Sequence, residues 1–534
     1  MKLDYIRLDA FKNLHNFSFD FDEAGSGLVT VLLGRNGSGK SNLLEALVII
    51  FRDLYLGKVT AFGYELRYTL DGGRTCVSIE SRPLEETSHR FVCSVTDEHG
   101  DKSISRSELR KVSERRLLPH HIFAYYSGPS DRLEEHFREH QRRFYRELLE
   151  GKEQPFRPLF YARPVHSQFV LLAFFTSGDP KIHQFLEEHL GILGLESALF
   201  VMQRPRWAKA KQKDNLGDGR FWGARGVVSG FLDRLFSNSL APLRLPGKTL
   251  IKGFERTRST EVLYLYIRDS ASLRGLAPID QPATEFFKEL ESTYISDLIQ
   301  QVRIRVRVRN CDGSLTFREL SEGEQQLLTV VGLLRFTKET ESLFLLDEPD
   351  THLNPGWGMK YLGILNEIAE PGNDSQVLMA THDPLVLAGL KRSEVIVMER
   401  NETEGRVEAF RPDVDPQGLG VVGILRSAMF GLSTTLDLPT QGKLDRRFEL
   451  VAKDEARTEA EDDELKRLSD ELADSGFAHE FRDANFDRFA KAIGRVRHSS
   501  KATLTKAEIL DLDREAEDVV RKILAEEADS DALR

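Results

Sequence analysis

The sequence has few cysteines and no long hydrophobic run. Its three cysteines, Cys76, Cys93 and Cys311, are widely spaced and include no Cys-x-x-Cys pair. This spacing argues against zinc ribbons and disulfide-stapled folds. The longest apolar stretch, around residues 169–175, is far shorter than the about 20 residues that a membrane-spanning helix needs. The first residues also lack the apolar core of a secretory signal. We therefore expect a cytoplasmic chain that makes no membrane contact.

Positive charge is in deficit. Lys and Arg number 74 and Asp and Glu number 85, which gives a formal net charge of −11. Such a chain has no global field that attracts nucleic acid, so any DNA contact must come from local basic patches. The charge thus neither supports nor excludes a DNA partner. The 534 residues are enough for several domains or for one large domain with insertions.

The first motif is a glycine-rich loop between a strand and a helix. Residues 28–33 form a buried-type apolar run, and residues 42–51 have helical apolar spacing. The loop between them allows backbone N–H groups to approach phosphates, Lys40 adds positive charge, and the Ser41 hydroxyl can bind Mg²⁺. An accidental glycine turn would not need these flanking elements. The loop predicts an ATP site whose residues are Gly34, Asn36, Gly37, Gly39, Lys40, Ser41 and Asn42.

The second motif is an apolar strand that ends in two carboxylates. Residues 343–346 are Leu-Phe-Leu-Leu and lead directly into Asp347 and Glu348. A buried strand would hold Asp347 rigidly at the magnesium ion, while Glu348 could act as the general base for an attacking water. A strand that simply ends in solvated acids is the alternative. With the phosphate-binding loop present, we predict Asp347 as a metal ligand and Glu348 as a catalytic residue.

Three further segments, in chain order, carry a resemblance to a known family. The segment 320–326, Leu-Ser-Glu-Gly-Glu-Gln-Gln, resembles the signature motif of ABC-type ATPases in the SMC, RecF and OLD branch. The segment 349–355 resembles the D-loop of that branch, and 380–384 resembles its switch-histidine segment. The resemblance implies an α/β P-loop ATPase head that hydrolyses ATP with Mg²⁺, with Glu348, Lys40 and His382 as catalytic residues.

The same resemblance implies a homodimer. Ser321 and Gly323, at the start of a helix, offer a hydroxyl, backbone donors and a helix dipole to an anion. In the family that anion is the γ-phosphate bound by the other subunit, so two ATP molecules would lie between head-to-tail protomers, with Asp350 near the seam. Ser321 as a simple helix N-cap, with Glu324 closing a capping box, is the alternative.

Two positions of the family pattern are less well matched. Lys12 and Asn13 resemble a position that contacts nucleotide, although a solvated turn accounts for them equally well. The segment 124–128, Ala-Tyr-Tyr-Ser-Gly, lies where the Q-loop is expected but has no glutamine. Metal coordination from that segment therefore stays open.

The motifs divide the chain into four parts. We expect an N-terminal ATPase lobe at 1–130 with a small antiparallel sheet at about 60–110, and a mostly helical insert at 131–300. A C-terminal ATPase lobe follows at 301–424, with strand character at 301–310. A charged helical extension at 425–534 completes the chain and could dock a partner.

The length of the insert and the residues found in the motifs suggest a branch of the family. The segments 125–128 and 347–353 look similar to the PtuA-type ATPases of Septu and retron systems, which act with a separate nuclease. This implies an ATPase of anti-phage defence that controls a separately encoded nuclease such as an HNH protein and has no intrinsic nuclease. The alternatives are a RecF-like repair ATPase that binds DNA directly and, less well matched, the ATPase subunit of a transporter.

Two basic segments are candidate nucleic-acid contacts. In the first, Arg303, Arg305, Arg307 and Arg309 alternate with apolar residues, which on a strand would align four guanidinium groups on one face. The alternative is a solvent-facing strand paired with acids on its neighbour. The second segment, 204–213, combines Arg and Lys with Trp207, which could stack on a base. It could equally be an ordinary basic loop.

Overall fold

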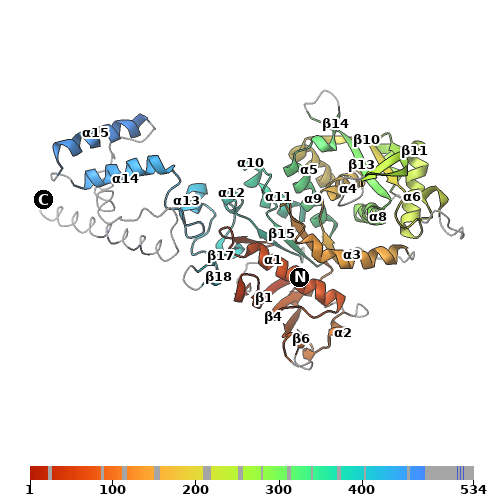
Figure 1. Cartoon of the computed structure of the whole chain (residues 1–534), viewed down its shortest axis with the longest axis horizontal. Helices are drawn as coiled ribbons and strands as arrows, with labels where there is room; N and C mark the ends of the chain where they lie inside the picture. Colours follow the sequence, from red (N-terminus) through yellow and green to blue (C-terminus); the bar gives the residue numbers. More distant parts are fainter. Residues whose placement is uncertain are drawn as a thin grey trace. The chain divides into compact units, whose positions relative to one another are not determined.

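The computed structural model describes two compact units of the chain, Met1–Arg411 and Pro412–Arg534 (Figure 1). It describes residues 1–474 and isolated positions between 511 and 521. The gaps before 474 are residues 22–26, 86–89, 111–116, 150–156, 209–217, 251–256, 278–280, 310–313, 338–340, 370–374, 402–404 and 454–456. No helix among the described residues is long and apolar enough to cross a membrane.

The centre of the first unit is a seven-stranded, mostly parallel sheet in the order β18-β17-β3-β16-β15-β8-β9. Its strands are β3 Val29–Leu33, β8 His121–Tyr126, β9 Leu159–Tyr161, β15 Ser342–Asp347, β16 Gln376–Ala380, β17 Val395–Arg400 and β18 Val407–Phe410. Only the β17–β18 pair is antiparallel. All five residues of β3 and all six of β15 are buried, as expected for the central strands of a parallel sheet.

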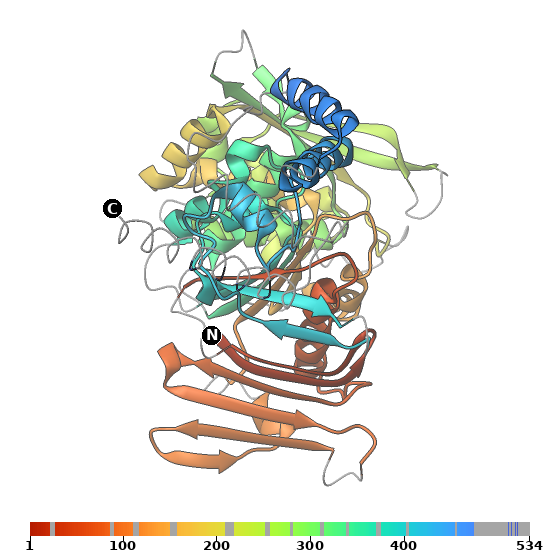
Figure 2. The ribbon, with the colours of Figure 1, turned by 90° about the vertical axis from the view of Figure 1, so that its left-hand side faces the viewer.

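A second sheet, fully antiparallel, has the order β2-β1-β4-β5-β6-β7. It consists of β1 Lys2–Phe11, β2 Leu14–Asp20, β4 Tyr64–Leu70, β5 Thr75–Ser81, β6 Phe91–Asp97 and β7 Gly100–Ser103. Figure 2 shows these strands together at the bottom of the view. The small antiparallel sheet predicted at 60–110 is confirmed and is continued by the two N-terminal strands. Alternating residues of β4 and β5 are buried, which is the pattern of a sheet with one face on the core.

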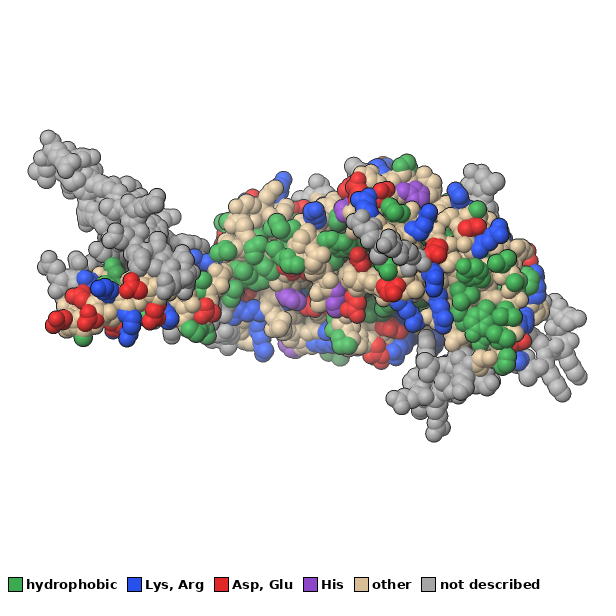
Figure 3. All heavy atoms as spheres, turned by 90° about the horizontal axis from the view of Figure 1, so that it is seen from above, with side chains coloured by type: hydrophobic (Ala, Val, Ile, Leu, Met, Phe, Trp, Pro, Cys, Tyr) green, Lys and Arg blue, Asp and Glu red, His purple; other side chains and the backbone are tan. Residues whose placement is uncertain are grey.

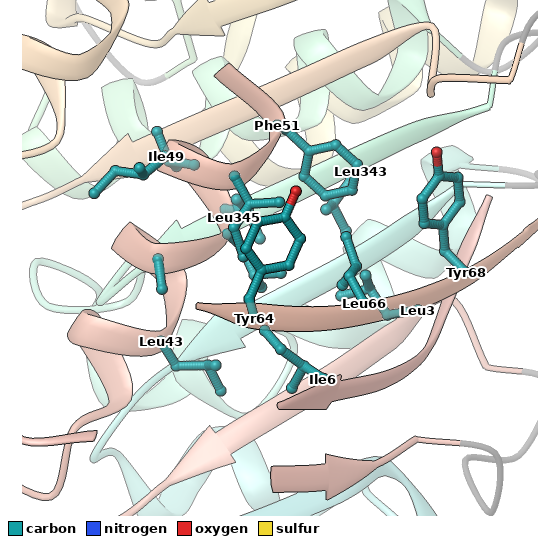
Figure 4. Close-up of a cluster of buried hydrophobic side chains, with 14 of the residues drawn as sticks. Leu3, Ile6, Leu43, Ile49, Phe51, Tyr64, Leu66, Tyr68, Leu343 and Leu345 are labelled. Carbon is teal, nitrogen blue, oxygen red and sulfur yellow. The ribbon is translucent and has the colours of Figure 1, made fainter. Parts of the chain in front are cut away.

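Helix α1, Lys40–Leu56, packs between the two sheets. Figure 4 shows side chains of α1, such as Leu43 and Phe51, between Tyr64 and Leu66 of the antiparallel sheet and Leu343 and Leu345 of the parallel sheet. These side chains belong to one buried cluster. Because α1 begins at Lys40, this core fixes the position of the glycine loop. The helix ends at Gly57, which adopts the left-handed conformation that favours glycine.

The insert contains helices and also a sheet that we did not predict. The helices and short 3-10 turns are α3 Glu134–Leu149, α4 Pro164–Thr176, α5 Pro180–Leu190, η2 Gly219–Phe221, α6 Val227–Asn238, α7 Ser270–Arg274 and α8 Ala283–Ile295. The five-stranded sheet has the order β11-β12-β10-β13-β14. Its strands are β10 Ile192–Gln203, β11 Leu240–Leu250, β12 Thr257–Ile267, β13 Ile299–Val308 and β14 Ser314–Thr316.

Two of the predicted boundaries differ in the structure, one because of this sheet and one because of the division into compact units. The strand at 301–310, which we assigned to the C-terminal lobe, is β13 and pairs with β10 of the insert. The last compact unit begins at Pro412 and not at residue 425. Strand β10 of the insert was not predicted because its sequence does not show a strand pattern. The run 198–202, Ala-Leu-Phe-Val-Met, lacks the period-two alternation of a half-exposed strand and is compatible with helix.

The remaining elements complete the ATPase lobe and the second unit. In the first unit they are η1 Asp71–Gly73, α2 Arg106–Leu109, η3 Phe317–Glu319, α9 Glu322–Phe336, α10 Pro355–Gly358, α11 Tyr361–Ala369, α12 Pro384–Leu387 and η4 Arg392–Glu394. The second unit has α13 Gly420–Arg426, α14 Leu438–Ala452 and α15 Glu459–Asp474. Helices α14 and α15 pack together and are linked by ion pairs such as Arg446 with Glu464 at 2.9 Å. The helical character predicted for the extension is confirmed over these residues.

Close packing of α9 on α4 joins the ATPase lobe to the insert. A Cβ at Gly332 of α9 would lie 2.2 Å from Cγ1 of Val170 on α4, whereas a Cβ at Gly363 of α11 would meet nothing within 4 Å. Both glycines are helical, so Gly→Ala gains the same helix propensity of about 1 kcal/mol at either site. We predict that Gly363→Ala stabilises the protein and that Gly332→Ala destabilises it by about 1–3 kcal/mol, measured by urea unfolding. Equal effects of the two substitutions would show that the helices do not meet closely at Gly332.

Candidate functional site

Four strand ends meet at the carboxyl edge of the parallel sheet. The glycine loop follows β3, the 381–383 turn follows β16, Asp347 ends β15, and Ser127 follows β8. These strands are neighbours in the order β3-β16-β15-β8, and Asp347 pairs in register with both Ala380 and Tyr126. Ligands of open α/β sheets bind at this edge. The topology therefore brings together motifs that are more than 300 residues apart in the chain.

The glycine loop has the geometry of a phosphate cradle. Gly37 and Gly39 have φ angles of 80° and 100°, and a Cβ at Gly34 would lie 2.2 Å from the carbonyl oxygen of Met398. The Lys40 ammonium donates to the carbonyl oxygens of Gly34, at 2.6 Å, and Arg35, at 3.3 Å. Burial lowers the pKa of Lys40, an effect that the negative charges of Glu348 and Asp347 oppose. Larger side chains at these glycines would be strained or would clash.

Ser41 and Asp347 lie together as the metal prediction requires. The Ser41 hydroxyl donates to Asp347 Oδ1 at 2.8 Å. Asp347 is fully buried, and burial raises its pKa to about 6, although the hydrogen bond from Ser41 and the charge of Arg132 oppose this shift. Its second oxygen, Oδ2, has no hydrogen-bond partner among the described residues, and neither has the buried Ser38 hydroxyl. A hard cation such as Mg²⁺ takes oxygen ligands, so this hydroxyl and carboxylate fit a magnesium–nucleotide site.

Glu348 adopts a backbone conformation that is rare for a side chain of its size. Its φ is 53°, and its N–H donates to the Ala380 carbonyl oxygen at 2.8 Å. Its own carbonyl oxygen accepts hydrogen bonds from Thr351 Oγ1 at 2.9 Å and Gln326 Nε2 at 3.4 Å. The Glu348 carboxylate lies 3.4 Å from Nδ1 of His382. Such strain persists only where neighbouring groups hold it, and it is common at functional sites.

Asp350, which the family resemblance puts near a subunit seam, is buried in this chain. Its carboxylate is buried and accepts a hydrogen bond from the Thr381 hydroxyl. Burial raises its pKa to about 6, and the hydrogen bond from Thr381 opposes the shift. Within this chain Asp350 therefore holds the turn that carries His382. Its place near a dimer seam stays a prediction.

The signature segment begins helix α9. Ser321 Oγ accepts from the N–H of Glu324 at 3.2 Å, and the Ser321 N–H donates to the Glu324 carboxylate at 2.7 Å, so Ser321 and Glu324 form a capping box. A Cβ at Gly323 would lie 2.5 Å from the carbonyl oxygen of His352, which explains the glycine by close packing on the D-loop. Ser321 is exposed. The simple N-cap that we considered is thus present, and an exposed capped helix start remains able to receive an anion.

Sequence reasoning missed a charged cluster on the other side of the loop. Glu45 of α1 is buried and lies 2.5 Å from Lys12 Nζ, 3.2 Å from His136 Nε2 and 3.6 Å from Arg132 Nε. Arg132 also lies 3.8 Å from Asp347 Oδ2. Burial would raise the pKa of Glu45, but hydrogen bonds from His136 and Lys12 and nearby positive charges lower it overall. Besides Lys12, the signal in the sequence was one acidic residue, Glu45, among the apolar residues of α1.

Other predicted residues are placed around this cluster. Asn13 donates to the Gly37 carbonyl oxygen at 2.8 Å and accepts from Asn42 at 2.7 Å, so Asn13 and Asn42 brace the loop. Asn36 is exposed at its tip. Ser127, in the segment expected to be the Q-loop, donates its N–H to the Asp347 carbonyl oxygen at 3.3 Å.

A cavity of about 380 Å³ adjoins this segment and is lined by Tyr125, Tyr126, Ser127, Tyr161 and Tyr294, among others.

Two ATPase families match parts of the chain. The family described as "AAA ATPase domain" matches residues 1–108, and the family described as "AAA domain, putative AbiEii toxin, Type IV TA system" matches residues 206–388. No curated protein matches the sequence. Among solved structures, the SMC head domain from Thermotoga maritima matches at 14% identity and covers 78% of this chain and 100% of its own, with a TM-score of 0.32. Together with the geometry of the glycine loop, the two family matches support an ATPase of the AAA families.

The buried carboxylate of Asp347 makes a testable link between site and stability. Its pKa in the folded protein, about 6, is above the value of 3.8 for an unperturbed aspartate, so its protonation stabilises the fold at low pH and this stability is lost as pH rises through about 6. We predict that Asp347→Asn without nucleotide raises the free energy of unfolding at pH 8 by about 1–3 kcal/mol but changes it little near pH 4. Magnesium-dependent nucleotide binding should be lost.

Asp470 of α15 supplies the control, because it is exposed. Asp470→Asn should leave both the pH profile of unfolding and nucleotide binding unchanged. If Asp347→Asn destabilised the protein at pH 8, the buried charge could not be the dominant cost at this site.

Proposed function

We propose that this chain is an ATPase that forms a homodimer around ATP and controls a separately encoded nuclease effector in anti-phage defence. The observation that carries the ATPase part is the contact of Ser41 with Asp347 at 2.8 Å beside Glu348 and Lys40. Phosphate-binding, metal-binding and general-base groups thus converge on one point. This convergence is what phosphoryl transfer to water requires.

Each residue around the phosphates has a distinct chemical task. Bound Mg²⁺ would neutralise charge on the phosphates, and Ser41 and Asp347 are the residues that would hold it. Lys40 and the loop N–H groups bind the phosphates, and Glu348 accepts the proton of the attacking water. His382 is 57% exposed and lies 3.4 Å from Glu348, so in this proposal it would hold that carboxylate and contact the γ-phosphate.

The homodimer part of the proposal is supported by the exposed start of α9. Ser321 and Glu322 are exposed, while Gly323 and Gln326 are buried against the D-loop and the Glu348 backbone. The N-terminus of α9 is thus exposed to solvent. Through Gln326, the same helix also contacts the backbone of Glu348 in its own protomer. Binding of a second protomer's γ-phosphate at Ser321 would therefore be felt directly at Glu348.

Control of a nuclease is the part that rests most on resemblance. The family matched over residues 206–388 is described as "AAA domain, putative AbiEii toxin, Type IV TA system". The name of a TA system supports a chain that acts together with a second gene product. A partner such as an HNH nuclease would read the ATP state of the dimer. Co-purification with the product of a neighbouring nuclease gene, in the presence and absence of ATP, tests this part directly.

The base assignment predicts a trapped dimer. Glu348→Gln keeps the size of the side chain but cannot accept a proton, so ATP turnover should fall by about 10²-fold or more. The variant should also accumulate as an ATP-dependent dimer, measured by light scattering after gel filtration. Normal turnover by Glu348→Gln would remove Glu348 from the base role, whereas lost turnover without a dimer would contradict only the dimer.

A mixing experiment tests whether the ATP site is shared. Lys40→Ala disables the phosphate loop, and Ser321→Asp retains an N-cap while placing a negative charge where the γ-phosphate would bind. Each variant alone should be inactive. In a two-fold dimer of one copy of each variant, one of the two ATP sites has an intact loop and an intact signature segment. Because about half of the dimers in an equimolar mixture contain one copy of each variant, mixing should restore up to about a quarter of wild-type turnover.

Ser105→Asp is the matched control for the cap. Ser105 begins α2 with the same capping box as Ser321, so its substitution by aspartate should preserve full activity. No recovery on mixing, with both proteins folded, would place Ser321 outside a shared ATP site.

A further inference from the structure

The five-stranded sheet of the insert has one covered face and one open face. Residues of the covered face, such as Phe200, Leu265 and Ile304, are at most 1% exposed. On the other face Leu240, Leu243, Leu245 and Tyr266 are 38–54% exposed. Figure 3 shows hydrophobic side chains gathered beside Lys and Arg side chains at its right-hand end, where β10 and β11 lie in Figure 1. Exposed apolar patches of this kind commonly mark binding surfaces.

The strand register places arginines and tyrosines on this open face. Leu199 of β10 lies opposite Tyr266 of β12 and also opposite Arg303 of β13, so all three side chains share one face. In the next row Val201 lies opposite both Tyr264 and Gln301.

The arginine row continues along β13. Arg305 lies opposite Ser197 and Arg307 lies opposite Gly194. Across the other edge of β13, Thr316 and Ser314 of β14 face Arg305 and Arg307. Neutral residues therefore flank the arginines on both neighbouring strands.

The three arginines have no acidic partner within the described part of the chain. Arg303, Arg305 and Arg307 are exposed, and no Asp or Glu described by the structure lies within ion-pairing distance of them. Arg309 differs, because it pairs with Glu187 at 2.7 Å. Glu319 is close enough to feel the charge of Arg305, but its carboxylate accepts hydrogen bonds from Thr316. Arg303, Arg305 and Arg307, called the arginine row below, thus present three exposed positive charges that form no ion pair with any described residue.

We propose that this face binds single-stranded nucleic acid, with phosphates on the arginine row and bases on Tyr264 and Tyr266. Alternate residues of a strand are about 7 Å apart, and β12 and β13, which flank β10, are about 10 Å apart. A chain that follows β13 would contact successive arginines, and its bases would extend across Leu199 toward the tyrosine rings. Sheet faces with aromatic rings and cationic borders bind single strands in this way.

A protein partner would suit the exposed leucines but not the arginine row. Three guanidinium groups in one row, without an ion pair to any residue that the structure describes, match a ligand with regularly repeated negative charge. Addition of a partner strand to the edge strand β11 is also disfavoured, because Pro242 and Pro246 have no N–H to donate. On binding, the exposed leucines of this face would pack against bases and sugars.

The test is binding of a fluorescent single strand by the full-length protein. The probes are oligo-dT and oligo-rU of about 20 nucleotides, longer than the roughly 4–16 nucleotides that an OB fold covers, and a duplex of equal length. We expect both single strands to bind more tightly than the duplex, and their relative affinities distinguish DNA from RNA as the natural ligand. In Arg303→Gln/Arg305→Gln/Arg307→Gln, affinity should fall at least about tenfold and the slope of log K against log salt should flatten by about 2.

Two further variants separate stacking from charge. Tyr264→Leu/Tyr266→Leu keeps an apolar face, so it should weaken binding by about tenfold with an unchanged salt slope. Arg142→Gln/Arg143→Gln/Arg146→Gln removes the same charge from the exposed side of α3 and should leave binding unchanged. Circular dichroism and wild-type ATP turnover would show that each variant is folded, and turnover separates this inference from the proposed ATPase function.

The proposal fails if the arginine-row and α3 variants lose affinity equally, because binding would then be a non-specific response to charge. It also fails if the sheet variants bind single strands normally. Loss of dimerisation or of a co-purified protein in those variants, with nucleic-acid binding intact, would instead assign this face to a protein partner.

Discussion

The hydrogen bond from Ser41 to Asp347 is the contact on which the site depends. It joins the residue after the phosphate loop to the end of a strand 306 residues later in the chain. The contact exists because β3, β16, β15 and β8 run parallel and end at one edge, while the core around α1 holds Lys40 and Ser41 against that edge. Changes in the core between the two sheets are therefore expected to act on the chemistry through this one contact.

Several ionisable side chains are buried close to the contact between Ser41 and Asp347. Asp347 and Asp350 are buried, and burial raises the pKa of each to about 6, while burial lowers the pKa of Lys40. Glu45 draws Lys12, His136 and Arg132 into a compensating network next to Asp347. The site thus contains charged groups that the protein alone only partly compensates. A ligand with both negative phosphates and a divalent cation complements this arrangement, which is why we expect nucleotide binding to stabilise the fold.

The motifs of the site could be predicted from sequence because each has a local physical cause. Glycines at 37 and 39 permit positive φ, an apolar strand ends at Asp347, and a Ser-x-x-Glu pattern caps α9. The position of Asp350 and the Glu45 cluster could not be predicted, since both depend on contacts between distant segments. The insert sheet was missed for a related reason: its central strand β10 is buried over most of its length and lacks the alternation that identifies a half-exposed strand. The partner and dimer assignments rest on resemblance and remain predictions.

In the proposed dimer, the phosphate loop of one protomer lies against the signature helix of the other when ATP is bound. Cysteines introduced at two exposed positions, Asn36→Cys in one tagged copy and Glu322→Cys in a differently tagged copy, measure this directly with a short bifunctional thiol cross-linker. Each single variant paired with wild type corrects for the native cysteines. The account predicts a cross-link between the two tags that requires both cysteines, ATP and Mg²⁺. A cross-link that forms equally well without ATP, or none at all in the ATP-bound Glu348→Gln background, would contradict it.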